Sequence, residues 1–366
     1  MQELKQPSKK PLIFYYVVIV LVIMLLNATL FPMMWETPVQ EVDYTTYSYA
    51  TSFGGEGAIT SAIDYVVSDE LPQLYVLEGH GEAELSAVFS DQLTKENVEV
   101  NTSSLLTENA VPDAADCVLI YAPESDISEE ERDILADYVS TGGKLLVLAG
   151  PTEVGTLTNL YSLLADYGVT AAEGIVVEGD SSHYAFGYPH ILLPDMADSE
   201  ITQSLTAENY YAIIPIAQGM TISDSASNVT ALLTTSDASF SKAAGYQLST
   251  YEKEEGDTDG PFAVAVSVAD TSGGEIVWFG SSLMLEEGYN DYSSGGNLDL
   301  VMNALSDLVG EREAIAIRSK SLDYNYLTIS ESTASLLKTV MIGVIPIAFA
   351  AAGIYVVAKR RMKRHG

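Results

Sequence analysis

The sequence predicts an α/β domain built on a parallel β-sheet and placed between two transmembrane helices. Short apolar segments alternate with amphipathic segments from residue 71 to about residue 170, at the spacing of βαβ units. Charge-free runs long enough to cross a bilayer stand near both ends of the 366-residue chain. The acidic residues are concentrated between those two runs, which indicates a solvated domain there.

Four apolar segments are the expected strands of the first half. Cys117 to Tyr121 is continuously apolar, as a strand covered on both faces should be. The other three expected strands are 74–77, 98–100 and 144–149. Strands at this spacing, with helices between them, predict a parallel sheet covered on both faces.

Helices are expected between these strands. Apolar residues recur at offsets of three and four between residues 85 and 93, which predicts the first helix. Ser128 and Glu131 form a capping box at the start of the next helix, and Gly142 follows its expected end. A third helix is predicted at 157–167.

The second half has a looser pattern. Strands are expected at 213–217, 231–234, 262–268 and 275–280, and a helix at 297–309. The charged segment 249–260 is expected to be a surface loop. We expect one extended α/β domain, and two half-domains are the alternative.

Residues 12–31 and 339–358 are the predicted transmembrane helices, because each contains no charge and reaches about 30 Å as a helix. A buried core helix is the alternative for either run, and a cleaved signal peptide is the alternative for the first. The predicted order is a cytoplasmic N-terminal tail at 1–11, a helix at 12–31, a stalk at 36–70, the extracellular α/β domain at 71–320, a juxtamembrane segment at 321–338, a helix at 339–358 and a basic cytoplasmic tail at 359–366.

The distribution of charge predicts the topology. Three lysines precede the first run, and five Lys or Arg residues follow the second. Basic residues next to a span mark the cytoplasmic side, so both termini are expected inside a two-pass plasma-membrane protein. The stretch 36–337 holds 50 acidic and 8 basic residues, which excludes nucleic acid and anionic lipid as partners of the domain.

The turn Gly79-His80-Gly81-Glu82 is the candidate binding site. It follows a predicted strand and precedes a predicted helix, which is where open parallel sheets bind ligands. The two glycines allow close approach of the backbone, and His80 and Glu82 could transfer protons or bind a metal. The alternative is a tight turn with a structural role only.

Motifs for other chemistry are missing from the sequence. There is no G-x-S-x-G nucleophile elbow and no G-x-x-x-x-G-K-[ST] phosphate loop. The single cysteine, Cys117, lies inside a predicted strand and is expected to be a core residue. His183 and His190 flank a Tyr- and Pro-containing segment, and metal binding there is an alternative with little support from the spacing. We therefore predict no catalytic residue, no metal and no cofactor.

Several motifs in order resemble the Gldg-type auxiliary proteins of bacterial ABC transporters. They are LYVLEGHGE, VLIYAPESDISEEERDILADYVSTGGKLLVLAGP, ALLTTS, DGPFAVAV, EIVWFGSSLML and GGNLDLVMNAL. The resemblance extends over residues 12–364, and it includes Pro346 in the final run and the basic end. It implies a flavodoxin-like or glutamine-amidotransferase-like extracellular domain and a non-catalytic accessory subunit that works with a permease and a cytoplasmic ATPase. The strong acidity and the short tails depart from the family.

Two other functions remain open from the residues. The first is a membrane-anchored ectoenzyme with its site at Gly79–Glu82. The second is an acidic surface module that binds cations or cell-wall material.

Overall fold

The computed structural model describes residues 42–43, 48–49, 52–53, 71–310 and 320–321. The predicted spans 12–31 and 339–358 and most of the predicted stalk at 36–70 lie outside these residues. Within the described ranges, no helix combines the length and the apolar character needed to cross a bilayer.

The chain divides into two units. In the first unit, strand β1 (Val42–Asp43) pairs with β2 (Ser48–Tyr49), and β3 (Ser52–Phe53) pairs with β19 (Lys320–Ser321), both antiparallel. Strand β3, which precedes the central domain in the sequence, therefore pairs with β19, which follows it. The second unit includes residues 71–310, and all the other described helices and strands belong to it.

Five parallel strands form one half of the main sheet of this unit, in the order β5-β4-β6-β7-β18. Numbered along the chain, the five strands are arranged 2-1-3-4-5. Their bounds are β4 Gln73–Leu77, β5 Glu99–Ser103, β6 Cys117–Tyr121, β7 Lys144–Leu148 and β18 Glu275–Phe279. The strands predicted in the first half of the chain are confirmed.

The other half of the sheet is antiparallel, which corrects the expectation of a parallel sheet throughout. Strand β17 pairs antiparallel with β18, and β14, β11, β13 and β8 extend the sheet from β17. The turn at 270–274 is too short for a parallel crossover, which needs a dozen residues or more. The bounds are β8 Val169–Ala171, β11 Asp195–Met196, β13 Met220–Ile222, β14 Val229–Thr234 and β17 Ala263–Ala269.

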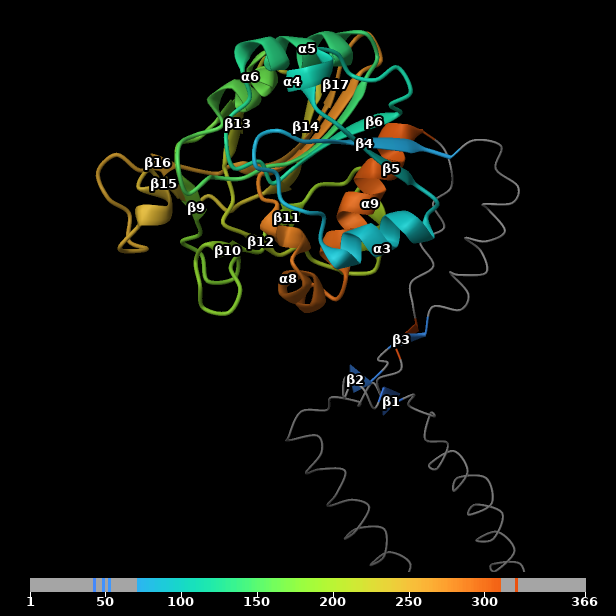
Figure 1. Cartoon of the computed structure of the whole chain (residues 1–366). Helices are drawn as coiled ribbons and strands as arrows, with labels where there is room; N and C mark the ends of the chain where they lie inside the picture. The colour runs from blue at the N-terminus through green and yellow to red at the C-terminus, as the bar shows by residue number, and fades with distance from the viewer. Residues whose placement is uncertain (1–41, 44–47, 50–51, 54–70, 311–319, 322–366) are drawn as a thin grey trace, which may run out of the picture. The chain divides into compact units, whose positions relative to one another are not determined.

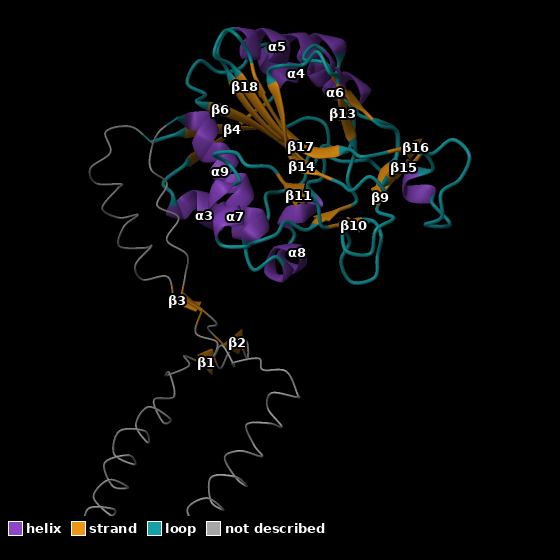
Figure 2. Ribbon diagram, turned by 180° about the vertical axis from the view of Figure 1, so that it is seen from behind, coloured by secondary structure: helices purple, strands orange, loops and turns teal. Residues whose placement is uncertain are grey.

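Helices cover both faces of the sheet (Figures 1 and 2). One face carries α4 (Leu105–Glu108), α5 (Glu129–Ser140) and α6 (Thr158–Ala165). The other carries α3, α7 and α9, whose bounds are α3 Ala87–Lys95, α7 Gln203–Ala207 and α9 Gly296–Val309. The domain is therefore a three-layer α/β structure, as the alternation of elements predicts.

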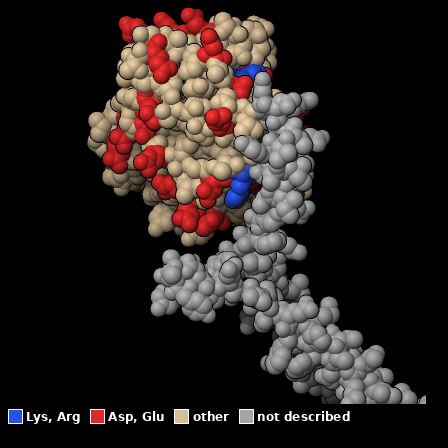
Figure 3. All heavy atoms as spheres, turned by 45° about the vertical axis from the view of Figure 1, so that its right-hand side comes forward, with Lys and Arg blue, Asp and Glu red and all other residues tan. Residues whose placement is uncertain are grey.

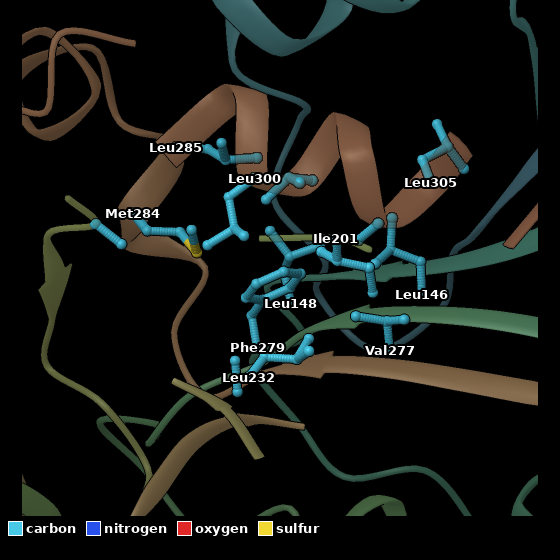
Figure 4. Close-up of a cluster of buried hydrophobic side chains, with 14 of the residues drawn as sticks. Leu146, Leu148, Ile201, Leu232, Val277, Phe279, Met284, Leu285, Leu300 and Leu305 are labelled. Atoms are coloured by element: carbon cyan, nitrogen blue, oxygen red, sulfur yellow. The ribbon is translucent and has the colours of Figure 1, made fainter. Parts of the chain in front are cut away.

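Successive side chains along the central strands point to opposite faces of the sheet and contribute to two separate hydrophobic cores. On β7, Leu145 and Val147 pack toward α5 and α6, while Leu146 and Leu148 pack toward α9. Figure 4 shows Leu146, Leu148, Val277 and Phe279 of the sheet beneath Leu300 and Leu305 of α9. Burial on both faces explains why these strands are apolar without interruption.

The predicted capping box of α5 is present. The Ser128 hydroxyl accepts a hydrogen bond from the Glu131 amide at 3.2 Å, and the Glu131 carboxylate accepts one from the Ser128 amide at 2.9 Å. Gly142, with φ +103°, follows the end of the helix in a conformation that favours glycine.

Smaller elements lie beside the sheet. Strands β9 (Ile175–Val177), β15 (Phe240–Lys242) and β16 (Thr258–Asp259) form a three-stranded sheet, and β10 (Ile191–Leu192) pairs with β12 (Ile214–Pro215). Short helices are η1 Gly245–Gln247, η2 Leu283–Leu285 and α8 Glu287–Tyr292.

The segment predicted as a surface loop, 249–260, is mostly exposed, yet it closes over a fully buried lysine. The Nζ atom of Lys242 lies 2.6 Å from Glu254 Oε2 and 3.0 Å from Asp257 Oδ2. Burial of the ammonium opposes its charge, but hydrogen bonds to these two carboxylates raise the pKa of Lys242. The loop is therefore fixed to β15 by an ion pair that the sequence pattern did not indicate.

Candidate functional site

The predicted turn Gly79–Glu82 lies at the carboxyl end of β4, between that strand and α3. Gly79 has φ +134° and Gly81 has φ +77°, in the region that L-residues with a side chain rarely adopt. A Cβ on Gly81 would also lie 3.2 Å from Cβ of Glu124. Both glycines are therefore required by the path of the backbone.

The carboxylate of Glu82 closes the turn on itself. Its Oε2 atom accepts hydrogen bonds from the backbone amides of Gly79 at 2.9 Å and His80 at 2.7 Å. The side chain of Glu82 is 7% exposed. These contacts give Glu82 a structural role in the turn, and they use the oxygen that a ligand would otherwise contact.

The side chain of His80 lies between two carboxylates. Its Nδ1 atom is 3.4 Å from Glu82 Oε1, and its Nε2 atom is 3.1 Å from Glu131 Oε2. Glu131 is the residue that caps α5, and its other oxygen, Oε1, is buried without a hydrogen-bond partner. The capping carboxylate of α5 thus also binds the turn after β4, which the sequence did not predict.

The backbone of the turn is fixed to the loop after β6. The carbonyl oxygen of His80 accepts hydrogen bonds from the amides of Glu124 at 3.1 Å and Ser125 at 3.0 Å. Strands β4 and β6 are neighbours in the sheet, and the chain continues from β4 to β5 on one side of this pair and from β6 to β7 on the other. The turn therefore lies at the topological switch point, where open α/β sheets form a crevice for ligands. That the turn binds a ligand stays a prediction.

Three tyrosines have pKa values that are raised by the same carboxylate, that of Glu286, and the sequence did not single them out. Burial raises the pKa of Tyr121, Tyr246 and Tyr289, and the negative charge of Glu286 raises each of them further. The negative charge of Glu153, in the loop after β7, also raises the pKa of Tyr246. These residues come from four separate chain segments, so only the tertiary structure brings them together.

The backbone is strained where these loops meet. Ala122, directly after β6, has φ +50°, and the β-branched Ile216 has φ +46°. A Cβ on Gly150, after β7, would lie 2.9 Å from the carbonyl oxygen of Gly280, after β18. Strain of this kind is retained where the surrounding structure enforces it, which is common at binding and catalytic sites.

Two candidate nucleophiles among the described residues, Cys117 and Ser281, are not available for reaction. Cys117 lies inside β6, and burial raises the pKa of its thiol to about 12, so the reactive thiolate does not form near neutral pH. The buried Ser281 hydroxyl donates a hydrogen bond to the carbonyl oxygen of Pro215 at 2.5 Å. Neither residue is activated by a neighbouring base.

Two further histidines, His183 and His190, do not share a site. His183 lies 3.4 Å from Asp180 and 3.5 Å from Asp195, whereas His190 stacks on the ring of Tyr251. Across the described ranges, no group of three or more His, Cys, Asp or Glu residues could hold a metal ion.

Comparison with known proteins identifies a family. The family described as an ABC-type uncharacterized transport system matches residues 71–304. The predicted resemblance to auxiliary proteins of ABC transporters is confirmed by this match. No curated protein matches the chain.

Several solved structures are similar to the chain at low sequence identity. The N-terminal domain of mmIFT52 is 15% identical, with 65% of this chain and 98% of that one covered and a TM-score of 0.49. A putative GMP synthase component from Thermoplasma acidophilum is 10% identical, with 66% and 97% covered and a TM-score of 0.35. PurLQS from Thermotoga maritima is 10% identical, with 65% and 100% covered and a TM-score of 0.33. At these scores the similarities support no statement about activity or partners.

Proposed function

Because the chain belongs to the family of ABC-type uncharacterized transport systems, we propose that it is a non-catalytic accessory subunit of an ABC-type transport complex. The observation that carries this proposal is the match over residues 71–304, which includes the whole sheet and most of α9. The partners that we propose are a permease in the membrane and a cytoplasmic ATPase.

The proposed subunit crosses the plasma membrane twice, with both termini in the cytoplasm and the α/β domain outside. Support comes from the charge-free runs 12–31 and 339–358 and from the basic residues that flank them. Small residues in the second run, such as Gly343 and Ala351, would let permease helices approach closely. The acidic domain would be repelled by the anionic cytoplasmic leaflet, which also favours the outer side.

The domain has, in this proposal, a flavodoxin-like fold extended by antiparallel strands. The order 2-1-3-4-5 of its parallel strands is the order of that fold, in which ligands bind between the first and third strands. Those strands are β4 and β6 here, and the turn at His80 joins the loops that follow them. We propose that the domain engages a substrate or surface partner at this edge.

A role without catalysis is supported by the state of the reactive groups. The thiol of Cys117 is buried in the sheet, and the hydroxyl of Ser281 is bound to a backbone carbonyl. His80 contacts two carboxylates rather than a hydroxyl or a thiol that it could deprotonate. These contacts hold the loops together and do not form a nucleophile with a base.

The test is affinity purification of the full-length chain in a mild detergent. We expect an ATPase and a permease to be recovered with it. Gly343→Leu should lower this recovery because a larger side chain separates packed membrane helices, whereas Val344→Leu, at the next position, should not. Recovery of the chain without either partner would contradict the proposed function.

The topology has its own test. Protease added to intact cells should cut the central region and leave both termini protected. A central region that is cut only after lysis would place the domain in the cytoplasm and contradict the proposed arrangement.

A further inference from the structure

Five exposed aromatic residues form what we call the aromatic surface: Phe186, Tyr188, Tyr211, Tyr251 and Tyr292, with exposed fractions of 52%, 53%, 49%, 38% and 59%. They come from the loop before β10, the segment before β12, the loop between β15 and β16, and the end of α8. Aromatic residues are enriched at protein interfaces, and a group of them in water indicates an interaction surface.

Direct contacts join these residues into two groups. The rings of Phe186 and Tyr292 have centroids 4.6 Å apart, and the Tyr211 hydroxyl donates a hydrogen bond to the carbonyl oxygen of Tyr292 at 3.0 Å. His190 joins the other two residues, with centroids 5.8 Å from Tyr188 and 5.4 Å from Tyr251. The rings are held in place before any partner arrives, which lowers the entropic cost of binding.

The backbone is strained in the segment that presents Phe186 to solvent. Phe186 has φ +58°, a conformation that is uncommon for a bulky residue, and Gly187 follows with φ +75°. Hydrogen bonds from Ala185 N to Ile191 O at 2.8 Å and from Tyr188 N to Ala185 O at 3.0 Å enforce this tight loop. The fold therefore keeps a strained loop that holds an aromatic ring outside the core.

The domain that carries the aromatic surface is strongly negative. Residues 71–310 contain 39 Asp and Glu residues against 5 Lys and Arg residues, and Figure 3 shows this excess on one face of the domain. Four of the five basic residues already contact carboxylates; they are Arg132, Lys144, Lys242 and Lys253.

Carboxylates also stand next to the rings in the chain. Asp291 precedes Tyr292 and Glu252 follows Tyr251, and both acids are exposed. Aromatic faces attract cations, and carboxylates neutralise them, so a partner that fits this surface is positively charged. An anionic partner would be repelled.

We propose that the aromatic surface binds a basic segment of a polypeptide, whose Lys or Arg side chains lie over the rings and face the neighbouring carboxylates. The rings come from four chain segments, so they match a ligand with several cationic groups rather than one small cation. This inference rests on the proposed function, in which the domain engages a substrate or a partner, and it names the chemical class of that ligand.

The experiment measures binding of fluorescently labelled hexa-arginine to the full-length chain by anisotropy, at low and at high salt. We expect saturable binding that weakens as salt rises, because the carboxylates that attract the peptide are exposed. Hexaglutamate with the same label and the uncharged oligosaccharide cellohexaose serve as comparison ligands. Binding of cellohexaose without binding of hexa-arginine would overturn the proposal, and so would no binding of hexa-arginine at low salt.

Variants test whether the rings themselves bind the peptide. The double variant Phe186→Ser and Tyr292→Ser should weaken hexa-arginine binding about four- to 25-fold, because each exposed cation–π contact contributes about two- to five-fold. Val100→Ser, an exposed residue on edge strand β5, should leave binding unchanged. Both side chains of the double variant are exposed, so the fold should survive, which circular dichroism checks. Equal loss in the double variant and in Val100→Ser would overturn the proposal.

A charge-matched pair separates local from general attraction. Asp291→Asn and Asp113→Asn each remove one exposed negative charge, but only Asp291 is adjacent to a residue of the aromatic surface, Tyr292. We expect the larger loss of hexa-arginine binding in Asp291→Asn, and equal losses would show attraction by net charge alone and overturn the proposal. If hexa-arginine binding is intact but no ATPase or permease is recovered in detergent, the proposed function is contradicted and the proposal for the aromatic surface stands.

Discussion

Replacing Glu131 by alanine tests the finding that one carboxylate both caps α5 and fixes the turn after β4. Its Oε2 atom accepts hydrogen bonds from the Ser128 amide at 2.9 Å and the Ser128 hydroxyl at 2.8 Å, and it lies 3.1 Å from His80 Nε2. The side chain is 4% exposed, so water cannot replace these partners. The substitution should therefore weaken the helix and the turn together.

The size of the effect follows from these contacts. Loss of the hydrogen bond that Glu131 accepts from the Ser128 amide costs about 1 kcal/mol, and loss of a hydrogen bond between His80 and a charged group costs about 1.5–3 kcal/mol. Removing the buried, unpaired Oε1 of Glu131 returns about 1 kcal/mol. We expect Glu131→Ala to lower the free energy of unfolding by about 1.5–3 kcal/mol.

Glu130 provides the matched control, because it is in the same first turn of α5 but is exposed. Glu130→Ala removes only a favourable interaction with the helix dipole, about 0.3–1 kcal/mol. Glu131→Gln keeps an acceptor for Ser128 and loses the charge that faces His80, so its effect should lie between the two.

Urea unfolding of the full-length chain, followed by tryptophan fluorescence, measures these differences. Trp278 is fully buried in β18, so its emission should change when the domain opens. All variants are compared in the same detergent. If Glu131→Ala and Glu130→Ala agree within about 0.5 kcal/mol, the double role of Glu131 is wrong.

Three further predictions concern the rest of the domain. Burial lowers the pKa of His190, so the unfolded chain binds a proton more readily than the folded chain does. The stability of the domain should therefore fall as pH drops below 6.5. Between about pH 7.5 and pH 5.5, His190→Phe should lose less thermal stability than the unchanged protein. Cys117 should resist alkylation at about pH 8 until urea opens the domain, as mass spectrometry would show, and rapid labelling of the folded chain would contradict its burial. Gly150→Ala should destabilise the domain by about 1–3 kcal/mol in urea unfolding, because the new methyl group would clash with Gly280. Gly288→Ala, which has open space around it, should be neutral or stabilise the domain by up to about 1 kcal/mol. The reverse order of the two variants would contradict this packing.

The elements of the first half could be predicted because local signals specify them. The apolar run at Cys117–Tyr121 is β6, and the Ser128–Glu131 capping box begins α5. The position of the Gly79–Glu82 turn was predictable for the same reason, since it follows one strand and precedes one helix. These signals act between residues only a few positions apart.

The second half was harder to predict because its strands are short and its pairings are not local. Strands β8, β9, β11, β13 and β15 have only two or three residues each, too few for a periodic pattern. The antiparallel direction of β17 depends on the turn that joins it to β18, and apolar content does not reveal strand direction.

The sequence by itself determined the first strands and helices, the acidic surface and the family resemblance, because each depends on composition or on neighbouring residues. The tertiary structure alone decided that His80 meets Glu131, 51 positions away, and that the charge of Glu286 raises the pKa of tyrosines from separate chain segments. Only packing of the sheet brings the loops after β4, β6, β7 and β18 to one edge. No local pattern encodes the distance between side chains on different loops.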